Sequence, residues 1–169
     1  MNKTRRMSRC AILVSLALVL SWAERLFPLQ LLVPLPGVKL GLANIVTLIA
    51  LYLMGAGEAF IILILRCLLG AMFAGSTVSL LFSLSGGLMA MAAMAAARHV
   101  RGLSVYGVSV LGAAAHSFGQ ILAAVLLMHS VCIWAYLSYL LLVSLFTGMA
   151  TGCMSAGVLR ALCALEKRA

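Results

Sequence analysis

The stretch from Ala59 to Gly75 has the sequence AFIILILRCLLGAMFAG, in which Arg66 is the one charged residue. A helix that crosses a bilayer needs about 20 predominantly apolar residues, so this stretch predicts a membrane span. Outward from it, comparable apolar stretches cover residues 10–27, 41–54, 78–97, 104–128 and 137–162. The sequence therefore predicts an all-α polytopic membrane protein with six transmembrane helices, forming a single integral membrane domain over residues 1–169.

The composition excludes a water-soluble fold. Of 169 residues, 65% are hydrophobic and 9% charged, against roughly 45–50% and about 25% in soluble domains. The five cysteines form no CxxC pair, which argues against a zinc site or a disulfide framework. The net charge of +9 comes from cations scattered between apolar runs, with no basic face interleaved with aromatic residues, so nucleic acid is not expected as a partner.

The placement of Lys and Arg predicts the orientation. With six spans both termini share a side, and nine of the twelve cations fall there: Lys3, Arg5, Arg6, Arg9, Arg98, Arg101, Arg160, Lys167 and Arg168. The opposite side holds Arg25 and Lys39. We therefore expect a multi-pass plasma-membrane protein with cytoplasmic N- and C-termini, in which the proline-containing stretch 28–39 is an extracellular loop. In an alternative interpretation, Ser21-Trp22-Ala23 is a signal-peptide cleavage site, which would leave five spans.

Arg66 lies near the middle of its predicted span, where an arginine costs roughly 2.5–3.5 kcal/mol on insertion scales and so needs a partner. Glu58 is about 12 Å away along the same helix at 1.5 Å per residue, which leaves Glu24 as the other candidate acid. Two interpretations stay open. Arg66 either bonds to backbone carbonyls or to Glu24 to hold helices together, or it faces a cavity and meets an anionic ligand.

Other polar residues lie at a similar depth. Gly112, His116 and Gln120 recur at i, i+4 and i+8 and share one helix face, which suits either interhelical hydrogen bonds or a ligand. Lys39 and Asn44 stand near a helix N-terminus, which favours anions, although an interfacial lysine and a packing asparagine would explain them too. In the outer half of the predicted membrane region, the three cations Arg25, Lys39 and Arg66 outnumber the one acid, Glu24, by two. The predicted substrate-binding residues are Lys39, Asn44, Arg66, His116 and Gln120, with Glu24 neutralising Arg66 in the empty state.

Small residues predict where helices touch. Gly148 and Gly152, continuing to Ala156, permit close backbone approach, as does the Gly86-Gly87 pair. In the first span, Ala11, Ser15, Leu18 and Ser21 form a partly small stripe, which would either dock another membrane protein or pack within the monomer.

Motifs for intrinsic catalysis are absent from the sequence. It has no GxxxxGK[ST] phosphate loop, no credible Ser/His/acid set, and no Asp with which to hold a diphosphate through Mg²⁺. We expect a protein without catalytic residues, cofactor or bound metal.

The segment VPLPGVKLGLANIVTL at residues 33–48 resembles the signature of the Gx transporter family, also labelled heptaprenyl diphosphate synthase component I. LRCLLG at 65–70, SGG at 85–87 and GAAAHSFGQ at 112–120 resemble its later motifs, although Ser117 stands where that family is expected to have Asn. The resemblance implies a six-helix bundle similar to the S components of energy-coupling factor transporters, which bind substrate from outside and work with a scaffold membrane subunit and an ATPase pair.

Three functions follow as hypotheses. The first is a substrate-binding subunit of an ATP-driven importer for a small anionic or polar metabolite, as the polar residues and the resemblance together suggest. The second is a non-catalytic membrane component in heptaprenyl diphosphate or menaquinone synthesis, and the third is a membrane anchor of a flavin-based extracellular electron-transfer complex. The second and third follow from the resemblance.

Overall fold

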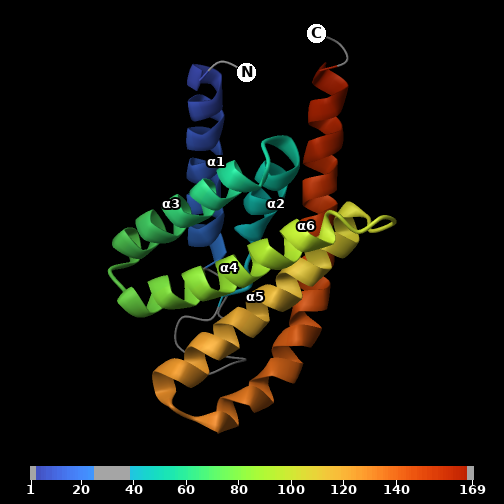
Figure 1. Cartoon of the computed structure of the whole chain (residues 1–169). Helices are drawn as coiled ribbons and strands as arrows, with labels where there is room; N and C mark the ends of the chain where they lie inside the picture. The colour runs from blue at the N-terminus through green and yellow to red at the C-terminus, as the bar shows by residue number, and fades with distance from the viewer. Residues whose placement is uncertain (1–2, 25–38, 167–169) are drawn as a thin grey trace.

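The computed structural model describes residues 3–24 and 39–166, and all regular structure in these ranges is helical (Figure 1). The predicted all-α class is confirmed. The elements are α1 Lys3–Ala23, α2 Asn44–Leu53, α3 Ala56–Ala74, α4 Thr77–Ala97, α5 Val105–Met128, the short 3-10 helix η3 Val131–Trp134, and α6 Ala135–Glu166.

Five helical segments are long and apolar enough to cross a membrane, namely α1, α3, α4, α5 and the segment Val131–Leu165. The remaining predicted span, 41–54, contains α2. This helix has ten residues, so it is about 15 Å long, which is half the thickness of a bilayer core. Every residue from Asn44 to Leu51 is buried. A helix that is apolar on all sides is covered on all sides, and here the covering is protein. The count of six membrane spans is therefore not confirmed.

Helix ends follow local signals in the sequence. The Ser76 hydroxyl accepts a hydrogen bond from the Ser79 N–H at the start of α4, and Ser104 does the same for Gly107 at the start of α5, as serine N-caps commonly do. Gly75 ends α3 in the left-handed conformation at φ 60°, which glycine adopts without steric cost. The predicted stretches 78–97 and 104–128 therefore match α4 and α5 to within one residue.

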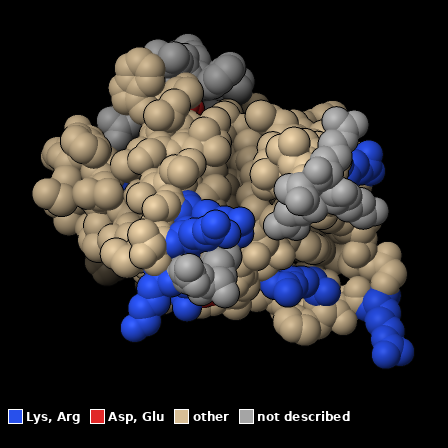
Figure 2. All heavy atoms as spheres, turned by 90° about the horizontal axis from the view of Figure 1, so that it is seen from above, with Lys and Arg blue, Asp and Glu red and all other residues tan. Residues whose placement is uncertain are grey.

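The start of α1 and the end of α6 lie at the same end of the bundle, with α2 set between them (Figure 1). Viewed from that end, Lys and Arg side chains gather on the surface (Figure 2). Arg5, Arg9, Arg98 and Arg160 are all exposed. The shared end and its positive charge agree with the predicted topology, and a cytoplasmic location for this end stays a prediction.

Close helix packing depends on glycines, as predicted for α6. A Cβ on Gly148 would lie 2.7 Å from Val110 Cα of α5, and one on Gly152 would lie 3.1 Å from Tyr106 Cα. The hydroxyls of Ser109 and Thr151 share a hydrogen bond of 2.7 Å across the same interface. The predicted contact face of α6 is confirmed, and it packs against α5.

Candidate functional site

Arg66 lies in the interior of α3 and is 6% exposed. Its Nη2 donates a hydrogen bond of 2.9 Å to Oδ1 of Asn44, the first residue of α2. Gly87 of α4 packs closely on α3 beside the guanidinium, since a Cβ there would lie 2.6 Å from Leu63 Cδ1 and 3.4 Å from Arg66 Nη2. Within residues 3–24 and 39–166, Arg66 Nε has no hydrogen-bond partner. A buried charge is thus held by an amide oxygen, and one of its donors is unused.

Glu24 directly follows α1 and is 4% exposed. Its Oε1 accepts a hydrogen bond from the backbone N–H of Gly41, and the N–H of Leu42 also faces the carboxylate. Both N–H groups belong to the turn that leads into α2, close to the helix end whose dipole favours negative charge. The charges of Lys39 and Arg66 act on the same carboxylate. Glu24 thus places a carboxylate beside the helix end at which the sequence predicted an anion.

Gln120 connects α5 to the segment before α2. Its Oε1 accepts the Lys39 backbone N–H at 3.3 Å, and its Nε2 lies 3.0 Å from His116 Nε2. Because the Gln120 NH₂ can only donate, His116 Nε2 must accept, which assigns the imidazole as neutral with its proton on Nδ1. The Lys39 ammonium donates to Ser83 Oγ of α4 at 2.7 Å.

The imidazole of His116 lies between two glycines from different segments. A Cβ on Gly86 of α4 would lie 2.7 Å from His116 Cε1, and a Cβ on Gly41 would lie 2.9 Å from Cδ2. Gly41 also has φ 84°, a conformation that side chains with a Cβ rarely adopt. Both positions require glycine, since any larger residue would move the ring and the atoms bonded to it.

The structure thus brings the six predicted site residues into one cluster, which we call the central cluster; five of them are buried and Lys39 is half-buried. Its members come from five places in the chain: Glu24 after α1, Lys39 before α2, Asn44 in α2, Arg66 in α3, and His116 and Gln120 in α5.

Two features of the central cluster differ from the sequence interpretation. Arg66 bonds directly to Asn44, where Glu24 or carbonyl groups were expected. Ser83 of α4 joins the cluster, and no sequence signal pointed to it. Arg25 and residues 28–38 of the predicted loop lie outside the described residues.

The central cluster carries a net positive charge. Lys39 and Arg66 carry two positive charges against the one carboxylate of Glu24, with His116 neutral by its hydrogen bond. In the described part of the chain no group of three or more His, Cys, Asp or Glu side chains could hold a metal ion. The arrangement suits recognition of an anion by fixed donors.

Comparison with known proteins identifies the family. The family model described as heptaprenyl diphosphate synthase component I matches residues 13–158. The chain belongs to the heptaprenyl diphosphate synthase component I family. The matched region contains every residue of the central cluster. No curated protein and no solved structure matches the chain.

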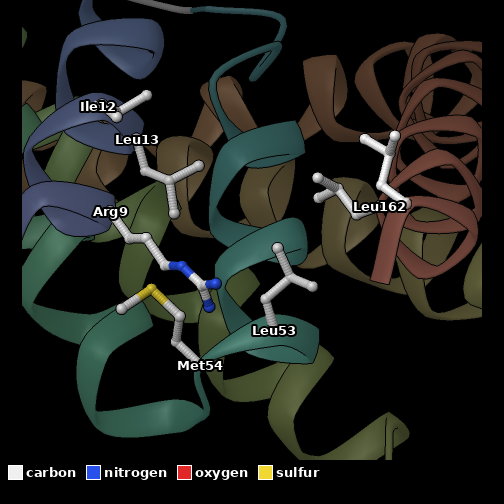
Figure 3. Close-up of a pocket in the computed structure, with 7 residues that line it drawn as sticks. Arg9, Ile12, Leu13, Leu53, Met54 and Leu162 are labelled. Carbon is white, nitrogen blue, oxygen red and sulfur yellow. The ribbon is translucent and has the colours of Figure 1, made fainter. Parts of the chain in front are cut away.

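This member of the heptaprenyl diphosphate synthase component I family also has hollows away from the central cluster. One, of about 390 Å³, lies between α1, the end of α2 and α6 and is lined by Arg9 and by apolar residues such as Leu53, Met54 and Leu162. Figure 3 shows Arg9 extending from α1 towards Leu53 and Met54. This hollow contains none of the predicted site residues, so it is separate from the cluster.

Proposed function

We propose that the protein is the substrate-binding membrane subunit of an ATP-driven importer, and that its substrate is a small anionic or polar metabolite. The observation that carries this proposal is the buried Arg66, whose Nε has no partner in the described part of the chain while its charge is held by an amide. A charged donor left unused in a membrane protein interior is costly unless something binds it. An anionic ligand would supply the missing acceptor.

The rest of the central cluster suits the same role. Lys39 adds a second positive charge, Asn44 and Gln120 offer amide groups, and His116 is held by Gln120 and two glycines. These groups come from segments distant in the sequence, so a ligand bound among them would bridge several helices. In this role the chain binds and passes on its substrate, and catalysis is left to partner proteins.

The partners of this proposal are a scaffold membrane subunit and an ATPase pair. The stripe of small residues on α1 supports contact with a scaffold subunit, because Ala11 and Ser15 are exposed beside a hollow of about 710 Å³ between α1 and α3. Small residues allow a partner helix to approach closely. In this scheme the ligand enters from outside the cell, and the termini are cytoplasmic.

Native mass spectrometry of protein extracted in mild detergent tests the binding role. We expect the wild-type chain to retain a small molecule that Arg66→Gln does not. Glutamine keeps an N–H donor for the Asn44 amide oxygen but removes the positive charge. Arg160→Gln is the matched control, since it removes an exposed cation of α6 and should leave ligand retention unchanged. If Arg66→Gln folds and retains the same molecule as the wild type, Arg66 is not part of the binding site.

A second candidate function follows from the family description. The chain would then be a non-catalytic membrane partner of a heptaprenyl diphosphate synthase. Co-purification from cells separates the two candidates. An ATPase pair with a scaffold subunit supports the importer, whereas a soluble synthase with Asp-rich motifs supports the synthase partner. A flavoprotein would point instead to the electron-transfer anchor.

A further inference from the structure

The N-terminal end of α2 is unusual because it lies inside the protein. The first two N–H groups of α2, those of Asn44 and Ile45, donate to the carbonyl oxygens of Gly41 and Leu42 in the turn before the helix. A bilayer core offers no water to pair the N–H groups of that turn, so other atoms of the protein must pair them. Gly41 and Leu42 present their N–H groups to a single acceptor, the Glu24 carboxylate, which is 4% exposed. That carboxylate is covalently part of the chain, yet it occupies the position that a bound anion would take.

A second observation points to a ligand at the same place. Arg66 is buried, reaches α2 at its first residue Asn44, and keeps Nε without a partner among the described residues. Its charge acts on Glu24, but its direct hydrogen bond goes to Asn44. Arg66 therefore stands near the Glu24 carboxylate without donating a described hydrogen bond to it.

We propose that this end of α2 is a carboxylate-binding site occupied by Glu24 in the present structure, and that the ligand of the central cluster carries a carboxylate that takes the place of Glu24. The first part depends only on the contacts of Glu24. The second part rests on the proposed function, and it narrows the substrate class to carboxylic acids.

A carboxylate on the ligand can make the same kind of contacts as the carboxylate of Glu24. An incoming carboxylate has two oxygens, so one can accept from Gly41, as Glu24 Oε1 does, while the other faces the positive charge of Arg66. Glu24 is joined to α1 and in this structure bonds to Gly41. A free ligand loses translational and rotational freedom on binding, so the exchange requires contacts that Glu24 does not make, such as one to Arg66.

Chemical rescue tests the carboxylate site. The full chain with Glu24→Ala is purified in mild detergent, and its thermal unfolding is followed in sodium acetate, formate or chloride of equal ionic strength. Loss of a buried carboxylate next to cations should lower the melting temperature by on the order of 10 °C. We expect acetate or formate to restore at least half of that loss. Chloride and the neutral analogue acetamide should restore much less.

Two controls define the result. Wild-type protein should respond to acetate much less than Glu24→Ala does, because Glu24 fills the site and acetate lacks the further contacts with which a larger ligand would displace it. Glu58→Ala should not respond either, although Glu58 is also a carboxylate at a helix N-terminus and is paired with Arg6. If Glu24→Ala does not fold, Glu24→Gln is measured in the same salts. Its neutral amide competes weakly with an anion, so acetate should stabilise it more than it stabilises the wild type.

The outcomes separate the two parts. Equal effects of acetate and chloride on the variant that folds would overturn the carboxylate site, whatever mass spectrometry shows of a ligand. Rescue by acetate supports that site even if the importer proposal fails. A retained molecule without a carboxylate group would overturn the second part alone, and a retained carboxylic acid would support it.

Discussion

Replacing Gly86 with alanine places a methyl group against the imidazole of His116. The new Cβ would lie 2.7 Å from Cε1 and 2.8 Å from Nδ1 of the ring, and 3.0 Å from Gln120 Cγ. On its other side the ring already lies against Gly41, where a Cβ position is 2.9 Å from Cδ2. The imidazole therefore cannot move away from α4 without displacing the segment that leads into α2.

Two opposing effects set the magnitude. Alanine is favoured over glycine in a helix interior by about 1 kcal/mol, whereas overpacking a well-packed core costs typically 1–3 kcal/mol. Gly70→Ala isolates the first effect, because a Cβ there would make an ordinary contact of 3.8 Å with Leu18 Cδ2. We expect Gly86→Ala to be less stable than Gly70→Ala by about 1–3 kcal/mol.

The assay is equilibrium unfolding from detergent micelles by added SDS, followed by circular dichroism. Gly86→Ala is also made together with His116→Ala, which removes the ring that the new methyl group contacts. The double variant should be more stable than the sum of the single changes predicts, by about 1 kcal/mol or more. Equal stability of Gly86→Ala and Gly70→Ala, with additive effects in the double variant, would refute the placement of His116 between the two glycines.

Two further predictions concern packing and buried hydroxyls. Gly148→Ala should destabilise the protein by about 1–3 kcal/mol, because its Cβ would lie 2.7 Å from Val110 Cα of α5. Gly157→Ala in the same helix is the control, because a Cβ there would have no atom within 4 Å. It should be neutral or stabilising in the same SDS assay. Thr47→Val should leave stability unchanged or raise it, because the fully buried hydroxyl has no hydrogen-bond partner in the described residues and losing it costs nothing. A loss above about 1 kcal/mol would show that this hydroxyl does have a partner.

The long helices were predictable because a membrane interior permits little else. Every backbone polar group must be paired within its own helix there, so long apolar stretches are helical whatever their propensity. The starts of α4 and α5 were predictable too, since Ser76 and Ser104 precede apolar stretches as serine N-caps. The start of α1 was less predictable. The predicted span begins at residue 10, while the helix begins at Lys3, because its first basic turns are helical without being apolar.

The length of α2 could not be predicted from composition. Residues 41–54 are as apolar as a membrane span, and lipid or protein on the outside of a helix selects for the same side chains. The distinguishing fact is that Gly41 turns the chain at φ 84° only three residues before α2 begins at Asn44. Several conformations are open to such a glycine, so the sequence alone leaves the start of the helix undetermined.

The members of the central cluster were predictable by type, but their pairing was not. A buried arginine or histidine in an apolar helix is costly enough to imply a partner, which singled out Arg66 and His116. Which partner each one meets depends on how helices distant in sequence pack. Ser83 bonds Lys39 from 44 residues away, and a serine in an apolar helix commonly bonds its own backbone. Nothing local distinguished it from the other serines.

The distribution of acids in the chain supports the importance of the α2 end. The chain has three acidic residues and twelve basic ones. Both acids whose side chains are described lie at helix N-termini, Glu58 in the first turn of α3 and Glu24 at the start of α2. Glu58 is 15% exposed and pairs with Arg6, which is 54% exposed, so water reaches this ion pair and reduces its contribution to stability. Glu24 is buried beside Lys39 and Arg66, where the lower dielectric strengthens each interaction. Of the two described acids, Glu24 is the one at which exchange of one anion for another would substantially change the contacts among α1, α2 and α3. The importer subunit that we propose would need such a coupling to report ligand binding to its partners.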